Sequence, residues 1–131
     1  RGDRPSMGDT PTMEPIGVHH VAVNVTDVEA AVAFYTGVLG GRVRDDRPDL
    51  GIAGAWIDLG AAQVHLVELP VPPSMGQHFA VRVDDLDAVV AELRAGGHDV
   101  ADPSQVGAGL QTFLTDPSGN TVELHQVLEG P

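Results

Sequence analysis

The sequence predicts an α+β protein built from two copies of one strand-helix-strand-strand-strand unit. Three observations support this prediction. The chain matches itself at an offset of 58 residues, apolar residues alternate at the start of each copy, and apolar residues then recur at helical spacing. A repeat that occurs only twice is typical of a duplicated supersecondary unit, whereas a solenoid needs more copies.

The repeat is clearest at the start of the two copies. Residues 20–33 (HVAVNVTDVEAAVA) align with residues 78–91 (HFAVRVDDLDAVVA), and 8 of the 14 positions are identical. The ends of the copies agree more weakly. There His65 aligns with Glu123, and each lies 45 residues after the histidine that begins its own copy. The two positions are therefore equivalent in the predicted fold.

The first copy begins with a strand in which Val21, Val23 and Val25 alternate with polar or small residues. Asp27 is placed to cap a helix whose apolar face consists of Val28, Ala31, Val32 and Tyr35. The pair Gly40-Gly41 ends that helix. Three shorter apolar segments follow as strands, around residues 42–44, 55–59 and 62–67.

The second copy repeats this order. Phe79, Val81 and Val83 form its first strand, and Asp84 or Asp85 caps a helix with an apolar face of Leu86, Val89, Val90 and Leu93. Gly96-Gly97 ends the helix, and strands are predicted around residues 111–115 and 121–127.

The domain organisation follows from these limits. One domain over residues 16–131 contains module one (about 16–69), a stiff linker with three prolines (70–76, PVPPSMG) and module two (about 77–128). Residues 1–15 are polar and rich in proline, so we expect a flexible arm outside the fold.

Composition excludes several functions. Nineteen acidic residues against seven arginines give a formal net charge of −12, which makes nucleic acid and anionic membranes poor partners. No apolar stretch approaches the roughly 18 residues of a spanning helix, so a soluble, cytoplasmic protein is expected. Without cysteine, any metal ion must be held by histidine and carboxylates.

The polar residues of the predicted strands share one face. Side chains alternate along a strand, so the residues between the apolar ones project together from the other side of the sheet. That face carries His20, Asn24, Gln63, His65, His78, Arg82, Thr121, Glu123 and His125. Burying so many polar groups without partners is costly, which favours a wet cavity that holds a ligand or a metal ion.

Four residues at repeat-equivalent positions form a candidate metal site. His20, His65 and His78 supply three imidazoles, and Glu123 supplies a carboxylate. Nitrogen and oxygen donors without sulfur suit zinc, nickel, cobalt, iron(II) or manganese.

The segments HHVAVNVTDVEAAVAFYTGVLGG and DPSGNTVELHQ resemble the opening and closing signatures of the vicinal oxygen chelate superfamily, which contains glyoxalases, bleomycin resistance proteins and extradiol dioxygenases. The resemblance covers about residues 16–128. It implies two βαβββ modules that form a cup-shaped mixed sheet around a divalent metal ion, with one ligand on the first and one on the last strand of each module. His20 and His65 match the first pair of ligands, and His78 and Glu123 match the second.

The resemblance also implies how such a site works. Family members chelate two neighbouring oxygens of a substrate on the metal ion. Glu123 is then the candidate general base, and His65 is an alternative proton carrier. His65 stands where glyoxalase I enzymes often have glutamate, which leaves Glu123 as the single carboxylate ligand. The candidates for substrate binding or for support of the ligands are Arg82, Asn24, Gln63, His125, Trp56 and Phe113.

Three functions stay open at this point. The first is a metal-dependent lyase or isomerase of the glyoxalase-like type, acting on a small oxygenated metabolite. The second is a binding protein that sequesters an antibiotic. The third is an Fe(II)-dependent dioxygenase with His20, His78 and Glu123 as a facial triad. The resemblance also implies a homodimer, with the site inside one chain or shared between two.

Overall fold

The computed structural model describes residues 12–128. Module one contains β1 (His20–Val25), α1 (Val28–Ala33), the π-helix η1 (Phe34–Val38), β2 (Arg42–Val43), β3 (Gly54–Leu59) and β4 (Ala62–Glu68). Module two contains β5 (Phe79–Arg82), α2 (Leu86–Ala95), β6 (Ser104–Val106), β7 (Gly109–Thr115) and β8 (Thr121–Val127). The predicted arm lies mostly outside the described residues, and its described end, residues 12–15, contains no helix or strand.

Each module forms its own four-stranded mixed sheet. The strand orders are β1-β4-β3-β2 and β5-β8-β7-β6. The first and last strands of each module run parallel, and the remaining pairs are antiparallel. This confirms the α+β class and the two equivalent units. Within residues 12–128, β1 pairs only with β4 and β5 pairs only with β8, so each sheet has one unpaired edge at its first strand.

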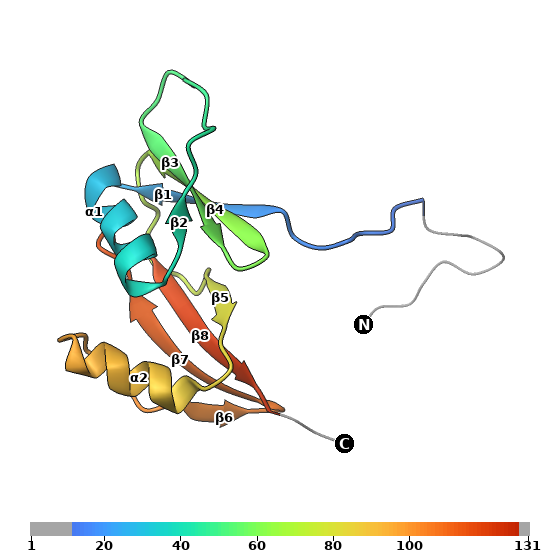
Figure 1. The fold of residues 1–131 in the computed structure, drawn as a ribbon, viewed down its shortest axis with the longest axis vertical. Coiled ribbons are helices and arrows are strands. Elements are labelled where there is room, and N and C mark those ends of the chain that lie inside the picture. The colour runs from blue at the N-terminus through green and yellow to red at the C-terminus, as the bar shows by residue number, and fades with distance from the viewer. Residues whose placement is uncertain (1–11, 129–131) are drawn as a thin grey trace.

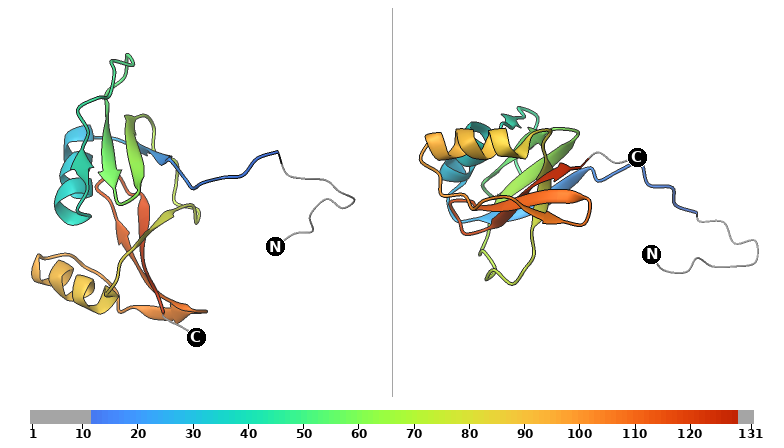
Figure 2. Two further views of the ribbon diagram at one scale, coloured as in Figure 1. Left: turned by 45° about the vertical axis from the view of Figure 1, so that its right-hand side comes forward. Right: turned by 90° about the horizontal axis from the view of Figure 1, so that it is seen from below.

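The helices begin where the aspartates predict. Asp27 caps α1 by accepting a hydrogen bond from the amide of Ala30, and Asp85, not Asp84, caps α2 through the amide of Ala88. In module one the helix continues as the π-helix η1, which the apolar spacing did not predict. Both helices lie on the same side of the molecule (Figures 1 and 2).

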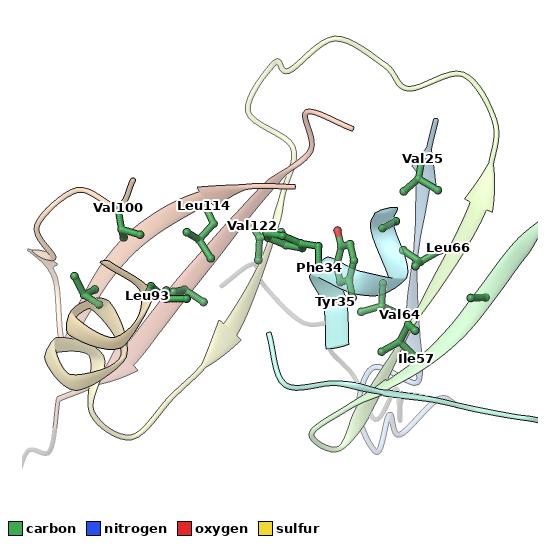
Figure 3. Close-up of a cluster of buried hydrophobic side chains, with 14 of the residues drawn as sticks. Val25, Phe34, Tyr35, Ile57, Val64, Leu66, Leu93, Val100, Leu114 and Val122 are labelled. Carbon is green, nitrogen blue, oxygen red and sulfur yellow. The ribbon is translucent and has the colours of Figure 1, made fainter. Parts of the chain in front are cut away.

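The apolar faces of the two sheets form the core with these helices. On β4 and β8 the alternation is as predicted, since Val64, Leu66, Val122 and Leu124 are all buried. Figure 3 shows one part of the core around Leu66 and another around Leu114, with Phe34 and Val122 between them. The opposite face of each sheet is left for the polar side chains.

A buried hydrogen-bond network joins the modules at the turn between β7 and β8. The carboxylate of Asp116 accepts hydrogen bonds from the hydroxyl of Tyr35, the amides of Ser118 and Asn120, and the Asn120 side chain. The same turn reaches β1, because Asn120 Nδ2 donates to the carbonyl of Asn24 at 2.8 Å. Tyr35 and Asn24 of the opening segment are therefore hydrogen-bonded to Asp116 and Asn120 of the closing segment.

No helix within residues 12–128 is long and apolar enough to cross a membrane.

Candidate functional site

The first predicted ligand pair lies on module one. His65 on β4 is the register partner of Ala22 on β1, so His20 is one alternation away on the same face. The imidazole rings of His20 and His65 stack, with centroids 3.9 Å apart and an interplanar angle of 11°. We call His20 and His65 the first half-site.

Trp56 forms one wall of the first half-site. It is the register partner of His65 across β3 and β4, and its ring stacks on His65 at 4.5 Å with an interplanar angle of 12°. The His65 ring therefore lies between the rings of Trp56 and His20. Gln63 holds the same imidazole through a 2.8 Å hydrogen bond between its Oε1 and Nε2 of His65.

The surroundings of His65 favour its neutral form. Burial lowers the pKa of His65 first, and the electrostatic effect of its neighbours His20, His19, Arg44 and Arg47 lowers it further. A neutral imidazole is the form that binds a metal ion or accepts a proton.

The second predicted ligand pair lies on module two. Nε2 of His78, just before β5, lies 2.9 Å from Oε1 of Glu123 on β8. Nδ1 of His78 lies 2.8 Å from the carbonyl oxygen of Gly76. These two acceptors, the Gly76 carbonyl first and Glu123 second, raise the pKa of His78. We call His78 and Glu123 the second half-site.

Phe113 has the same relation to the second half-site as Trp56 has to the first. It is the register partner of Glu123 across β7 and β8, and its ring lies edge-on to His78 with centroids 5.4 Å apart. Its side chain is exposed and lies outside the core. Each half-site thus has one aromatic wall supplied by the neighbouring strand.

Glu123 is a buried carboxylate that stays ionised. It is 8% exposed, and this burial raises its pKa. Hydrogen bonds from His125 and His78 act in the opposite direction and outweigh the burial, so the net pKa of Glu123 is lowered. His125 contributes through its Nδ1, which lies 2.8 Å from Oε2.

The chain does not bring the two half-sites together. Within residues 12–128, no group of three or more His, Cys, Asp or Glu side chains is placed to hold one metal ion. Figure 1 shows why, because the half-sites belong to two different sheets, one on β1 and β4 and the other at β5 and β8. Each sheet therefore presents two of the four predicted ligands.

Several cavities among the described residues are lined by both modules. One, of about 320 Å³, is lined by Ala22 and Asn24 of β1 and by His78, Gln77 and Thr121 of module two. Asn24 also donates a hydrogen bond to the carbonyl of Pro70 at the start of the predicted linker. Another cavity, of about 590 Å³, is mostly apolar and includes Arg82. Arg82 is exposed and forms no ion pair among residues 12–128.

Sequence reasoning missed two neighbours of the first half-site. Nδ1 of His19 lies 2.8 Å from Nδ1 of His20. The guanidinium of Arg47 packs against Gly54, which lies on the same face of β3 as Trp56. Arg47 comes from an irregular loop, so strand alternation could not place it. The doubled histidine at positions 19 and 20 was a visible signal for His19.

The chain resembles known proteins along most of its length. It is 30% identical to the uncharacterized protein YaeR of Escherichia coli (strain K12), covering 83% of this chain and 95% of that protein. It is 30% identical to the lactoylglutathione lyase GLX1 of Arabidopsis thaliana and 28% identical to the mitochondrial methylmalonyl-CoA epimerase of Mus musculus, covering 82% and 83% of this chain. The matches span 43% of the lyase and 72% of the epimerase.

Solved structures of related proteins also superpose on this chain. A Bacillus anthracis protein assigned to the glyoxalase family superposes with a TM-score of 0.76 at 25% identity, covering 91% of this chain and 99% of that one. TnmS3, an antibiotic binding protein from Streptomyces sp. CB03234, superposes with a TM-score of 0.71 at 29% identity, covering 88% and 98%. The family model matches residues 17–124. The chain belongs to the Glyoxalase/Bleomycin resistance protein/Dioxygenase superfamily.

Proposed function

We propose that this protein is a metal-dependent lyase or isomerase of the glyoxalase-like type, acting on a small oxygenated metabolite that chelates a divalent metal ion through two oxygens. One observation carries the proposal. Two equivalent strand pairs each present a preformed pair of ligand-type side chains on the same face, His20 with His65 and His78 with Glu123. Relatives named as a lyase and an epimerase support a chemical step at such a site.

The four side chains fit a borderline divalent metal ion. Three imidazoles and one carboxylate match the preferences of zinc, nickel, cobalt, iron or manganese. The low pKa of His65 and the ionised state of Glu123 keep both in the form that a metal ion requires. When bound, the ion would act as a Lewis acid that stabilises negative charge developing on the substrate oxygens.

The complete site forms between two copies of the chain in this proposal. The first half-site of one protomer meets the second half-site of its partner in a homodimer. The separation of the half-sites within one chain supports this arrangement, as do the unpaired edges of β1 and β5. An isologous dimer would then contain two identical sites.

The side chains around the half-sites have separate tasks. Glu123 serves as the general base, and His65 is the alternative proton carrier. Trp56 and Phe113 supply apolar walls, and the exposed Arg82 binds a substrate carboxylate. Gln63 and Asn24 orient the first half-site and the linker through the hydrogen bonds described above.

Metal analysis of protein purified without a chelating tag tests this function. We expect about one divalent ion per chain in the wild type, and its loss in the double variant H20A/E123A. Trp56 is the only tryptophan and stacks on His65, so its fluorescence should change as metal is added to the apoprotein. Wild-type protein that takes up no divalent ion under these conditions would contradict the proposal.

Sequestration of a small molecule is the second candidate function. The likeness to TnmS3, an antibiotic binding protein, and the cavity of about 320 Å³ between the modules favour it. The net charge of −12 suits a cationic ligand. Calorimetry with a cationic antibiotic such as bleomycin separates the two functions, because a binding protein would hold the drug tightly after all metal has been removed.

A further inference from the structure

Both oxygens of the Glu123 carboxylate are held by imidazoles. Oε1 lies 2.9 Å from Nε2 of His78, and Oε2 lies 2.8 Å from Nδ1 of His125. An ionised carboxylate only accepts hydrogen bonds, so each facing nitrogen carries a proton in the metal-free protein. His78 would give up the proton on Nε2 when it binds a metal ion, which frees Oε1. His125 follows Glu123 by two residues on β8, which places the two side chains on the same face of the sheet.

The ring of His125 packs over a glycine of the neighbouring strand. It lies over Gly109 at the beginning of β7, where a Cβ atom would be 2.6 Å from Cε1 and closer still to Nε2. The backbone of Gly109 does not have a positive φ, so its conformation is open to any residue. Glycine leaves room there for the imidazole in the position in which its Nδ1 faces Glu123, and a Cβ would displace the ring.

We infer that His125 is a positioning residue: by donating to Oε2 it fixes the Glu123 carboxylate and reserves Oε1, which faces His78, for the metal ion or the substrate proton. The inference rests on the proposed function of Glu123. A carboxylate whose second oxygen is occupied cannot turn to bind through both oxygens, and it has less freedom to lose when it binds through one.

In module one a different residue orients the equivalent side chain. His65, the equivalent of Glu123, is held by Gln63, which lies two positions before it on the same face of β4. In module two the supporting residue lies two positions after the ligand. Each half-site thus has one ligand from the last strand of its module, and that ligand is oriented by a same-face neighbour on the same strand.

Metal affinity of the full-length protein tests the inference, with cobalt(II) or zinc as the probe. We expect His125→Leu to bind the ion about 10–100-fold more weakly than the wild type, the usual effect of removing a residue that orients a ligand. His125→Asn should bind nearly normally, because its amide nitrogen is bonded to the same Cγ as Nδ1 of histidine. Gln111→Leu is the matched control, since Gln111 lies directly across from His125 on β7.

Gly109→Ala tests the packing of the imidazole over Gly109 without changing His125. The new methyl group should displace the imidazole and weaken metal binding as much as His125→Leu does. The shorter asparagine does not extend over Gly109, so Gly109→Ala should have no effect in the His125→Asn background. A variant that only lowered stability would weaken both backgrounds, and melting temperatures of all variants identify that case.

Nitrogen NMR of the histidine rings in metal-free protein supplies a readout that does not depend on the metal. We expect His125 with its proton on Nδ1 in the wild type and loss of that hydrogen bond in Gly109→Ala. If the wild type binds metal and His125→Leu binds it equally well, the inference is overturned and the proposed function stands. If the wild type binds no metal but His125 shows the Nδ1 proton, the proposed function fails, while the hydrogen bond by which His125 positions Glu123 is supported.

Discussion

Tyr35 joins the two modules through one hydroxyl. Its side chain is fully buried and donates a 2.8 Å hydrogen bond to Oδ2 of Asp116, which is 3% exposed. Removing a hydrogen bond to a buried carboxylate costs about 1–3 kcal/mol. We therefore expect Tyr35→Phe to lower the free energy of unfolding by this amount, measured by chemical denaturation. Thr36→Val is the control, because the Thr36 hydroxyl donates to the carbonyl of Val32 in the preceding turn and, among residues 12–128, to no group of the other module.

The same tyrosine should determine stability at alkaline pH. Burial, the charge of Asp116 and the hydrogen bond to it raise the pKa of Tyr35 far above its usual range. The folded state therefore favours the neutral phenol. Its contribution is fully present below the unfolded-state pKa of about 10 and is lost as the pH rises from there toward the higher folded-state pKa.

The composition makes this prediction testable. The chain has one tyrosine, no lysine and no cysteine, so no other side chain titrates between about pH 9 and 12. The melting temperature of the wild type should fall above about pH 10, and that of Tyr35→Phe should stay flat. Tyrosinate absorbance should appear together with the loss of circular dichroism, and ionisation ahead of unfolding would contradict the prediction.

At the scale of elements, the end of the first helix depends on two glycines with opposite requirements. A Cβ at Gly41 would lie 2.5 Å from Cγ2 of Ile57 and 2.7 Å from the carbonyl oxygen of Tyr35, whereas a Cβ at Gly37 would meet nothing within 4 Å. We expect Gly41→Ala to destabilise the protein by about 1–3 kcal/mol through overpacking. Gly37→Ala should stabilise it by about 0.5–1 kcal/mol, since alanine is the better helix former. Thermal unfolding of both variants measures whether each substitution lowers or raises the stability of the protein.

The elements themselves were largely predictable from the sequence. Alternation located the strands of both half-sites, and the aspartate caps and glycine stops located the helices, because these signals act within a few residues. The apolar spacing did not predict the π-helix η1. This segment carries Tyr35, whose hydroxyl donates to Asp116 in the other module. Sequence spacing says nothing about such a distant contact.

The same limit applies to the candidate site as a whole. The alternation of side chains along the strands was enough to put His20 with His65 and His78 with Glu123. His20 and His65 lie on paired strands of one sheet, and His78 directly precedes the strand that pairs with the strand of Glu123. Whether the pairs meet depends on how two sheets that share no strand pairing within residues 12–128 are placed, and no local signal in the sequence records that placement. The packing of His125 over Gly109 could not be predicted from the sequence either, because it depends on the register of β7 against β8.

The shared site predicts complementation between two inactive variants. His20→Ala breaks the first half-site, and Glu123→Ala breaks the second. In a mixed dimer, one site combines both defects, and the other combines the intact His78 and Glu123 of one protomer with the intact His20 and His65 of its partner. Random pairing makes half of the dimers mixed, so about one quarter of all sites should bind metal again.

Co-refolding of equal amounts of the two variants, followed by metal analysis, measures this recovery. Each variant refolded alone is the control and should bind almost no ion, because one ligand is missing from every site. A site built inside one chain gives a different result, since every site then keeps its own defect and mixing recovers nothing. Recovery of about one quarter therefore requires that the half-sites of different chains meet, whereas no recovery in a mixture shown to contain mixed dimers would place all four ligands within one chain.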